Sequence, residues 1–198
     1  MPILRVMTQP RPRRSSWAER PPANWAEREA HRLAREVYRL RGKRSAQWLA
    51  DRTRELGYEV SRSVISDLEN GRRRYVTTAE LAILAAALDT SPATLMYPGP
   101  YRDSVEFLPG RSVSEFDAVQ WFSANNWSIE LINAFNDFGF VWHGNTDLLR
   151  KYRRLAELEE ARSRVMARAE LDRDLDQISM YDKMIRELRQ QIEGSEDA

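Results

Sequence analysis

Five helix-start signals between residues 24 and 97 constrain the fold more than any other feature of this chain. Asn24, Ser45, Ser61, Thr77 and Ser91 are residues whose side-chain oxygens accept the free backbone N–H groups of a first helical turn. Because these starts lie only 14 to 21 positions apart, the helices between them must be short. We therefore predict a compact domain of five helices over residues 24–97, and an all-α fold.

Helix stops and apolar spacing agree with this division. Gly42, Gly57 and the pair Asn70–Gly71 follow the first three predicted helices, and such residues tolerate the left-handed backbone of a helix end. In the third helix, within residues 61–70, the inward side carries three apolar residues: Val64, Ile65 and Leu68. That spacing predicts one buried face and one exposed, polar face.

Charge is distributed unevenly along the chain. Residues 1–75 contain 18 basic and 9 acidic residues, whereas residues 76–198 contain 13 basic and 21 acidic residues. A basic first part favours a polyanion as its partner. Residues 1–23 are rich in proline and arginine, which predicts a basic flexible arm that is either simply solvated or lies along a nucleic-acid groove.

The chain beyond the five helices divides into two further predicted segments. Residues 98–127 are expected to be a linker and a short helix, the latter capped by Ser114 with Asp117. Residues 128–198 are expected to be a helical oligomerisation or interaction region. Its second half has heptad spacing from Ile178 onward, so a long amphipathic or coiled-coil-like segment is predicted, either as one helix or as a hairpin.

Several functional classes find no support in the composition. The chain has no cysteine, and its two histidines, His31 and His143, have no partner at metal-ligand spacing. No glycine-rich phosphate loop and no nucleophile motif is present, so we expect no enzyme, no catalytic residue, no metal and no cofactor. No apolar run reaches the ~18 residues of a membrane helix and the first residues lack a signal core, so a cytoplasmic protein is expected.

The second and third helices are arranged as a DNA-reading pair would be. A helix, a turn and a serine-started helix with an inward apolar side form the helix-turn-helix arrangement, whose second helix needs a small polar edge to enter the major groove. Arg62, Ser63, Ser66 and Asp67 supply that edge. Asp67 would either accept a hydrogen bond from cytosine or pair with Arg62 or Arg74. Arg72, Arg73 and Arg74 follow the helix, where they could reach phosphates.

At these residues the chain resembles the Cro/lambda-repressor (XRE-type) helix-turn-helix family. The resemblance spans Arg35 to Pro98 and is carried by the phrases VSRSVISDLENGRRR and TTAELAILAAALDTSPATLMYP. It implies a sequence-specific transcriptional regulator of double-stranded DNA, and we expect a repressor. The later phrases EFLPG and AVQWF resemble an extension of helix-turn-helix proteins from actinobacteria and their phages, so phage immunity control and host control are both expected settings.

The resemblance also implies roles for individual residues. Ser61, Arg62, Ser63 and Asp67 would meet base edges or nearby phosphates, with Ser66 beside them on the exposed face. Glu69 matches a mainly structural position. The expected phosphate contacts are Lys43, Arg44, Ser45, Gln47, Arg72, Arg73 and Arg74. The expected minor-groove contacts of the arm are Arg11, Arg13 and Arg14. The connection RTRELGYEVSRS is longer than the usual turn of the family.

Two other interpretations remain open at this point. The chain could be an interaction protein that binds a protein partner through its C-terminal helices and does not read DNA sequence. It could also be a monomer whose basic patch at residues 150–154 adds a second DNA contact. The leading hypothesis is a homodimer that binds an operator in double-stranded DNA. The sequence does not indicate a small-molecule effector.

Overall fold

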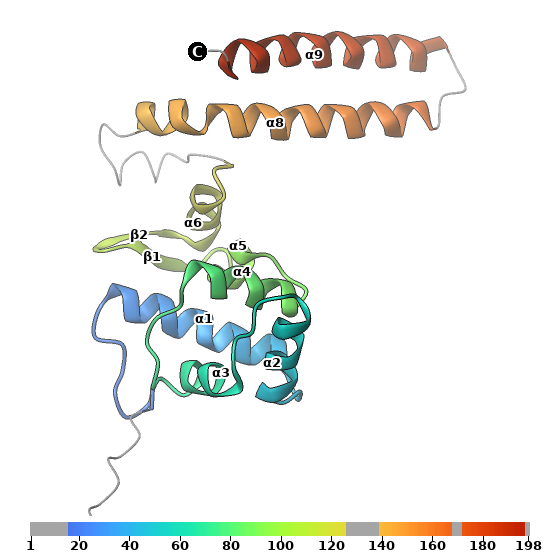
Figure 1. Ribbon diagram of the computed structural model, residues 1–198. Coiled ribbons are helices and arrows are strands. Elements are labelled where there is room, and N and C mark those ends of the chain that lie inside the picture. Colours follow the sequence, from blue (N-terminus) through green and yellow to red (C-terminus); the bar gives the residue numbers. More distant parts are fainter. Residues whose placement is uncertain (1–15, 126–138, 168–171, 197–198) are drawn as a thin grey trace, which may run out of the picture. The chain divides into compact units, whose positions relative to one another are not determined.

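A computed structural model describes residues 16–125, 139–167 and 172–196. The chain forms two compact units, residues 1–119 and residues 120–198. The elements of both units are labelled in Figure 1: α1 Trp25–Arg41, α2 Ala46–Glu55, α3 Arg62–Glu69, α4 Thr78–Ala87, α5 Pro92–Met96, β1 Ser104–Leu108, β2 Arg111–Ser114, α6 Glu115–Phe122, α8 Gly139–Met166 and α9 Asp172–Glu196. The described residues are mainly helical, as predicted, and include one small sheet.

All five predicted helix starts are confirmed as caps. Each side chain accepts a hydrogen bond from the backbone N–H three residues later, as seen for Asn24, Ser45, Ser61, Thr77 and Ser91. At α4 the cap is reciprocal, because the Glu80 carboxylate also accepts the backbone N–H of Thr77. The short, separately capped helices must then bury their apolar faces against one another.

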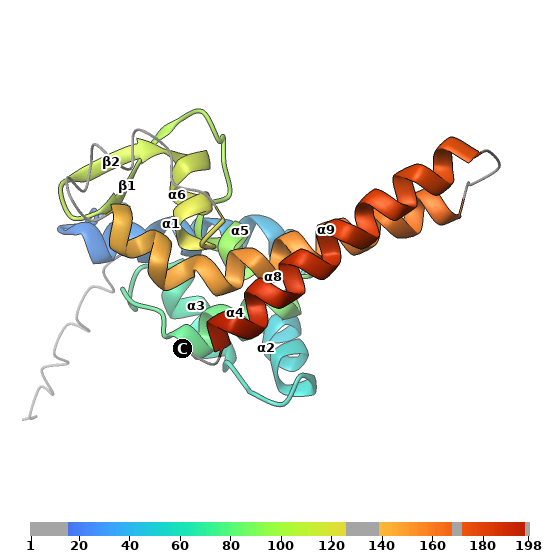
Figure 2. The same ribbon diagram turned by 90° about the horizontal axis from the view of Figure 1, so that it is seen from above.

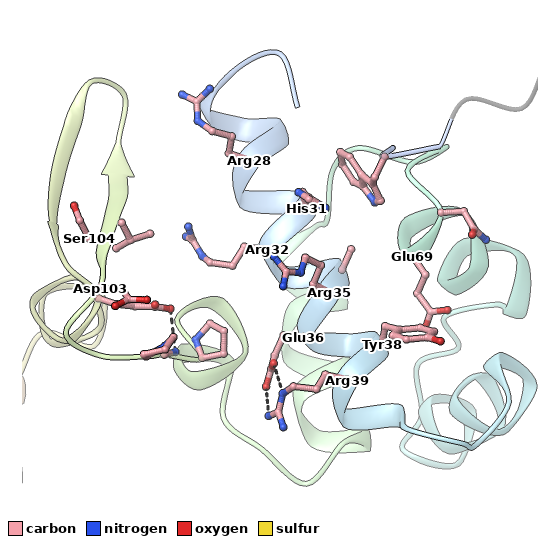
Figure 3. Close-up of a pocket in the computed structure, with 18 residues that line it drawn as sticks. Arg28, His31, Arg32, Arg35, Glu36, Tyr38, Arg39, Glu69, Asp103 and Ser104 are labelled. Carbon is pink, nitrogen blue, oxygen red and sulfur yellow. Dashed lines mark hydrogen bonds and ion pairs between the residues drawn. The ribbon is translucent and has the colours of Figure 1, made fainter. Parts of the chain in front are cut away.

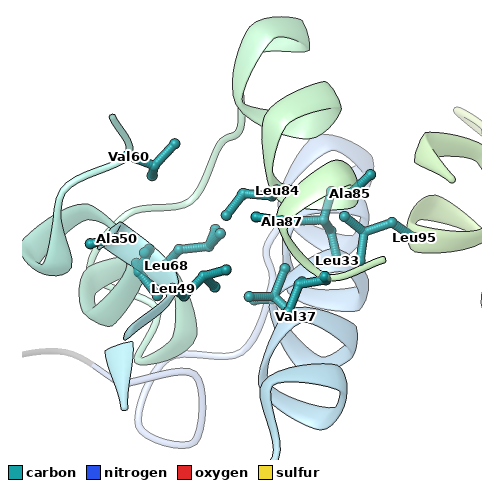
Figure 4. Close-up of a cluster of buried hydrophobic side chains, with 13 residues drawn as sticks. Leu33, Val37, Leu49, Ala50, Val60, Leu68, Leu84, Ala85, Ala87 and Leu95 are labelled. Atoms are coloured by element: carbon teal, nitrogen blue, oxygen red, sulfur yellow. The ribbon is translucent and has the colours of Figure 1, made fainter. Parts of the chain in front are cut away.

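The core of the first unit lies where α1 to α5 converge (Figure 4). Val37 of α1, Leu49 of α2, Ile65 of α3 and Leu95 of α5 have 0% of their surface exposed, and Leu84 of α4 has 1%. Each helix thus contributes at least one fully buried aliphatic side chain. This shared core fixes α3 on the surface of the unit with its other face outward.

The predicted linker over residues 98–127 needs a correction. Its expected short helix is α6, but β1 and β2 form an antiparallel hairpin in the segment that was expected to be irregular. Val105, Phe107 and Val113 are buried on one side of the hairpin. The Arg28 side chain of α1 donates a 2.6 Å hydrogen bond to Glu106 of β1, so the hairpin is attached to the helical domain.

In the second unit, α8 and α9 lie side by side as an antiparallel hairpin (Figure 1, Figure 2). Leu158, Val165, Ile185 and Ile192 are buried between them. Three pairs cross from helix to helix: Arg162 with Asp182, Arg189 with Glu159, and Lys151 with Ser195. Of the two forms that the sequence allowed for this region, the hairpin is therefore the correct one.

Candidate nucleic-acid interface

The exposed face of α3 forms an open, polar hollow. Ser61 caps the helix, and Ile65 and Leu68 anchor its inner side in the core. The hollow on the outer side has a volume of about 430 Å³ and is lined by Arg62, Ser63, Ser66, Asp67 and Arg72. The structure thus brings four of the five predicted base-contacting residues together with one predicted phosphate contact. Ser61 lies at the edge of this group, where its hydroxyl is used by the cap.

The long connection before α3 is held by one buried hydroxyl. Thr53 of α2 is fully buried, and its Oγ1 donates to the Ala50 carbonyl while it accepts the Val60 N–H, both at 2.9 Å. The Thr53 carbonyl also accepts the N–H of Tyr58. Because both ends of the connection are tied to one residue, its extra length does not leave the start of α3 loose.

A buried ion pair joins α3 to α1. Arg41 Nε and Nη2 donate to the two carboxylate oxygens of Glu69, each at 2.8 Å, and the two side chains are only 11% and 10% exposed. The hydrogen bond to Glu69 is the main reason why the pKa of Arg41 is raised. Glu69 therefore has the structural position that the family resemblance implied, and it points away from the hollow.

The C-terminal end of α3 is covered by Trp17. Its indole N–H donates a 2.9 Å hydrogen bond to the Leu68 carbonyl, and its ring stacks on His31 with centroids 4.7 Å apart. Gly71 has a φ of +77° and lies so close to Trp17 that an added Cβ would be 2.8 Å from the indole. Only glycine fits here without strain. Sequence reasoning missed Trp17, since no local pattern indicates a contact across 51 positions.

The polar groups of the hollow differ in how far they are already satisfied. Among the described residues, Arg62 makes no hydrogen bond or ion pair, and it is exposed. Ser63 shares a 2.9 Å hydrogen bond with Ser61. Asp67 accepts a 2.5 Å hydrogen bond from Arg72 Nε, so its partner is neither of the predicted ones, Arg62 or Arg74. Arg62 is thus a group of the hollow whose whole guanidinium is available for a new partner.

The predicted phosphate contacts around the start of α2 have mixed environments. Lys43 is exposed, and Ser45 is occupied as the cap of α2. Arg44 donates to the carbonyls of Arg41 and Leu40 at 3.0 and 2.8 Å, so its guanidinium closes the end of α1 and lies over the Trp48 ring. The Gln47 amide donates to Asp51 within the same helix.

Arg73 and Arg74 have structural partners, which changes how we interpret the arginine run. Arg73 donates to both carboxylate oxygens of Glu80 at 2.6 and 2.9 Å, and its side chain is only 16% exposed. Arg74 donates to Glu27 at 2.7 Å and lies over the Trp17 ring, with 12% of its side chain exposed. Both guanidiniums hold the fold together, so we do not retain them as phosphate contacts.

Some predicted residues fall outside the part of the chain that the structure describes. The arm contacts Arg11, Arg13 and Arg14 are among them, and so are residues 128–138 of the predicted oligomerisation or interaction region. Their predicted roles remain predictions. Trp17 lies against the end of α3, and the Arg20 carbonyl accepts a 2.6 Å hydrogen bond from Arg74. The described part of the predicted arm, residues 16–23, is therefore attached to the domain and is not a flexible segment.

A second, larger hollow follows the outer face of α1. It has a volume of about 1050 Å³, and its labelled residues include Arg28, His31, Arg35 and Arg39 (Figure 3). Most of its charges are already paired: Arg39 donates to Glu36 at 2.7 and 2.6 Å, and Glu115 accepts the Gly99 N–H. Acidic and basic side chains balance along this hollow, so it lacks the positive excess that a polyanion requires.

The described residues, 16–125, 139–167 and 172–196, contain neither a candidate metal cluster nor a candidate membrane span. In these ranges no three histidine, aspartate or glutamate side chains come together as metal ligands would. No helix there is both long enough and apolar enough to span a bilayer. The chain contains no cysteine.

Comparison with known protein families identifies the domain that carries the α3 hollow. Residues 38–95 match the family described as helix-turn-helix, a segment that begins within α1 and ends within α5. No curated protein and no solved structure matches the chain significantly. The matched family is a DNA-binding regulatory domain and not an enzyme family. Residues 38–95 are therefore a DNA-binding helix-turn-helix domain of the Cro/lambda-repressor (XRE) type, with α2 and α3 as its helix-turn-helix pair.

Proposed function

We propose that this protein is a sequence-specific transcriptional regulator, a repressor that binds an operator as a homodimer. The observation that carries the proposal is the polar hollow on α3, in which Arg62 has no described partner inside a helix-turn-helix domain. An arginine in this position matches guanine, because two of its N–H groups can donate to O6 and N7 at once. The basic character of residues 1–75 supports the same assignment.

In this proposal α3 enters the major groove with its capped end first. Arg62, Ser63 and Ser66 face base edges, and Lys43 with Gln47 at the start of α2 approaches the backbone of one strand. The residues of the arm, Arg11, Arg13 and Arg14, are proposed to add minor-groove contacts. Occupancy of a promoter would then exclude the polymerase, which is why we favour repression.

Arg62→Ala is expected to weaken binding to the preferred duplex by roughly 1–3 kcal/mol and to relax the preference at one base pair. The preferred sequence comes first, by selection of duplexes from a random pool with the purified full-length protein at near-physiological salt. Titrations of wild type and variant against the selected duplex, and against each single-base change of it, then measure the effect.

Arg54→Ala is the matched control for that experiment. Arg54 is also an exposed arginine, but it lies in the last turn of α2 and pairs with Asp51 outside the hollow. Its removal should leave every base preference unchanged. If the wild type itself selects no sequence and binds all duplexes weakly, the protein does not read DNA, and a protein partner becomes the better assignment.

The homodimer is proposed from the second unit. The α8–α9 hairpin leaves several large apolar side chains exposed, including Leu149, Tyr152, Leu175 and Met180. Two helices alone cannot cover such side chains, and a second hairpin could bury them. A twofold dimer predicts an operator with inverted half-sites about one helical turn apart, or a multiple of that distance.

A chain cut after Asn125 is expected to be monomeric and to bind the inverted repeat about a hundredfold more weakly, since the second half-site contact is lost. Sedimentation equilibrium gives the mass, and titration of the operator gives the affinity. A full-length Leu149→Lys, Tyr152→Lys variant keeps the hairpin and should behave like the truncated chain. The homodimer is contradicted if the wild type itself has the mass of one chain, and its assignment to the hairpin is contradicted if both altered proteins still have the mass of two chains.

A further inference from the structure

We propose that Arg72 is a second guanine-reading residue and that Asp67 is the positioning residue that holds its guanidinium for this task. The inference rests on the proposed function, because it assigns specificity to the same hollow. It starts from the placement of Arg72, which follows α3 in sequence but lines the hollow together with Arg62. A flexible phosphate contact would need no such placement.

The backbone on both sides of Arg72 is fixed. The N–H of Gly71 donates to the Leu68 carbonyl at 3.1 Å, and the N–H of Arg73 donates to the Asp67 carbonyl at 2.9 Å. Arg73 is held further by its bidentate bond to Glu80. The chain therefore folds back over the end of α3, and the Arg72 side chain leaves it from a defined position.

The Arg72 guanidinium is fixed at one edge and available at the other. Its Nε donates to Asp67 Oδ1 at 2.5 Å, and its Nη2 pairs with the same oxygen. The described contacts do not use Nη1, and the Ser66 Oγ lies 3.5 Å from Nη2, at the limit of a hydrogen bond. The edge formed by Nη1 and Nη2 carries two N–H groups that can donate to guanine O6 and N7 at once.

The Arg72–Asp67 ion pair is exposed enough for the arginine to contact DNA. The Arg72 side chain is 29% exposed and that of Asp67 is 40% exposed, so solvent screens the pair and it contributes little to folding stability. Its main effect is to remove rotamer freedom from a long side chain before DNA arrives, which lowers the entropy lost on binding. The carboxylate also disfavours a phosphate at the same place, which directs Arg72 toward a base.

The test uses the full-length protein and its selected duplex with all single-base changes. Arg72→Ala is expected to lose, roughly ten- to a hundredfold, the discrimination for guanine at one base pair that Arg62→Ala does not affect. Asp67→Asn should relax the same base pair. It should also bind random duplex more tightly at low salt, because it removes a negative charge near the phosphates. A purely structural role of Asp67 predicts the gain in random-duplex binding as well, but no loss of preference confined to the base pair that Arg72 reads.

The double variant and a charge control complete the test. Asp67→Asn added to Arg72→Ala should not change the base preference further, since the two residues act as one unit. Arg164→Ala removes the same charge from an exposed pair in the second unit and should leave discrimination intact. The proposal is overturned if Arg72→Ala weakens all duplexes equally and only reduces the salt slope, or if Asp67→Asn relaxes a different base pair. A wild type without sequence preference overturns the proposed function, and this assignment with it.

Discussion

Glu80→Ala is expected to lower the free energy of unfolding of the first unit by about 3–5 kcal/mol, the usual loss when one partner of a buried ion pair is removed. Glu80 and Arg73 are only 11% and 16% exposed along their side chains. The carboxylate accepts two hydrogen bonds from Arg73 and also the N–H and hydroxyl of Thr77. Its removal leaves a buried guanidinium without its carboxylate and removes the reciprocal half of the α4 cap, while Thr77 still accepts the backbone N–H of residue 80.

Urea titration followed by circular dichroism measures this loss. Glu55→Ala is the matched control, because Glu55 also pairs with an arginine at the end of its own helix but is 63% exposed. The control should cost no more than about 0.5 kcal/mol. Equal losses in the two variants would mean that the Arg73–Glu80 pair is not held in the buried geometry described here.

The pKa of Glu80 predicts how the free energy of unfolding depends on pH. Burial opposes ionisation of Glu80, but the hydrogen bonds from Thr77 and Arg73 together outweigh it and lower the pKa below the ordinary 4.5. Stabilisation by the ionised carboxylate is therefore fully present above pH 4.5 and is lost as the pH falls through the lower, folded-state pKa. Glu29 acts in the opposite direction, since burial raises its pKa. The difference between wild type and Glu80→Gln isolates the contribution of Glu80 and should shrink on acidification.

Helix starts could be predicted from the sequence because a cap is a local signal. Each capping oxygen is bonded to a backbone N–H three residues away, so residue type and spacing are enough to predict it. The β1–β2 hairpin was not predicted, because the local signals in that segment pointed in different directions. Proline and glycine around it indicated a linker, while the alternation of Val105, Phe107 and Val113 was the weaker signal of a strand pair.

The arginine run shows what local patterns cannot decide. Arg72, Arg73 and Arg74 are adjacent and chemically equal, yet their carboxylate partners are 5, 7 and 47 positions away. Which arginine is buried and which lines the hollow depends on the tertiary positions of Glu80 and Glu27. Local sequence therefore indicates a basic helix end, but the division between structural and DNA-facing roles needs the fold.

The form of the C-terminal region was undecided for a similar reason. Heptad spacing indicates that an apolar stripe packs against a partner helix. It does not indicate whether the same chain or a second copy supplies that helix. The cross-helix pairs decide this point, because their sequence separations fall from 44 to 30 to 20 positions toward the turn. Only an antiparallel return of the same chain gives that progression.

Arg41→Met is expected to destabilise the first unit by about 3–5 kcal/mol, because it leaves the Glu69 carboxylate buried without its partner at the join of α1 and α3. Adding Glu69→Leu should recover most of that loss, since apolar side chains of similar volume often replace a buried ion pair without cost. Urea titrations of the two single variants and the double variant measure the coupling between the residues.

Binding of the selected duplex by the double variant then separates stability from orientation. The bidentate Arg41–Glu69 bond has a defined geometry, whereas Met and Leu contact each other in many arrangements. If the pair orients α3 for the major groove, the double variant should be nearly as stable as the wild type and still lose discrimination at several base pairs together. A double variant that is stable and reads DNA like the wild type would show that the apolar core around Ile65 is sufficient to orient the helix.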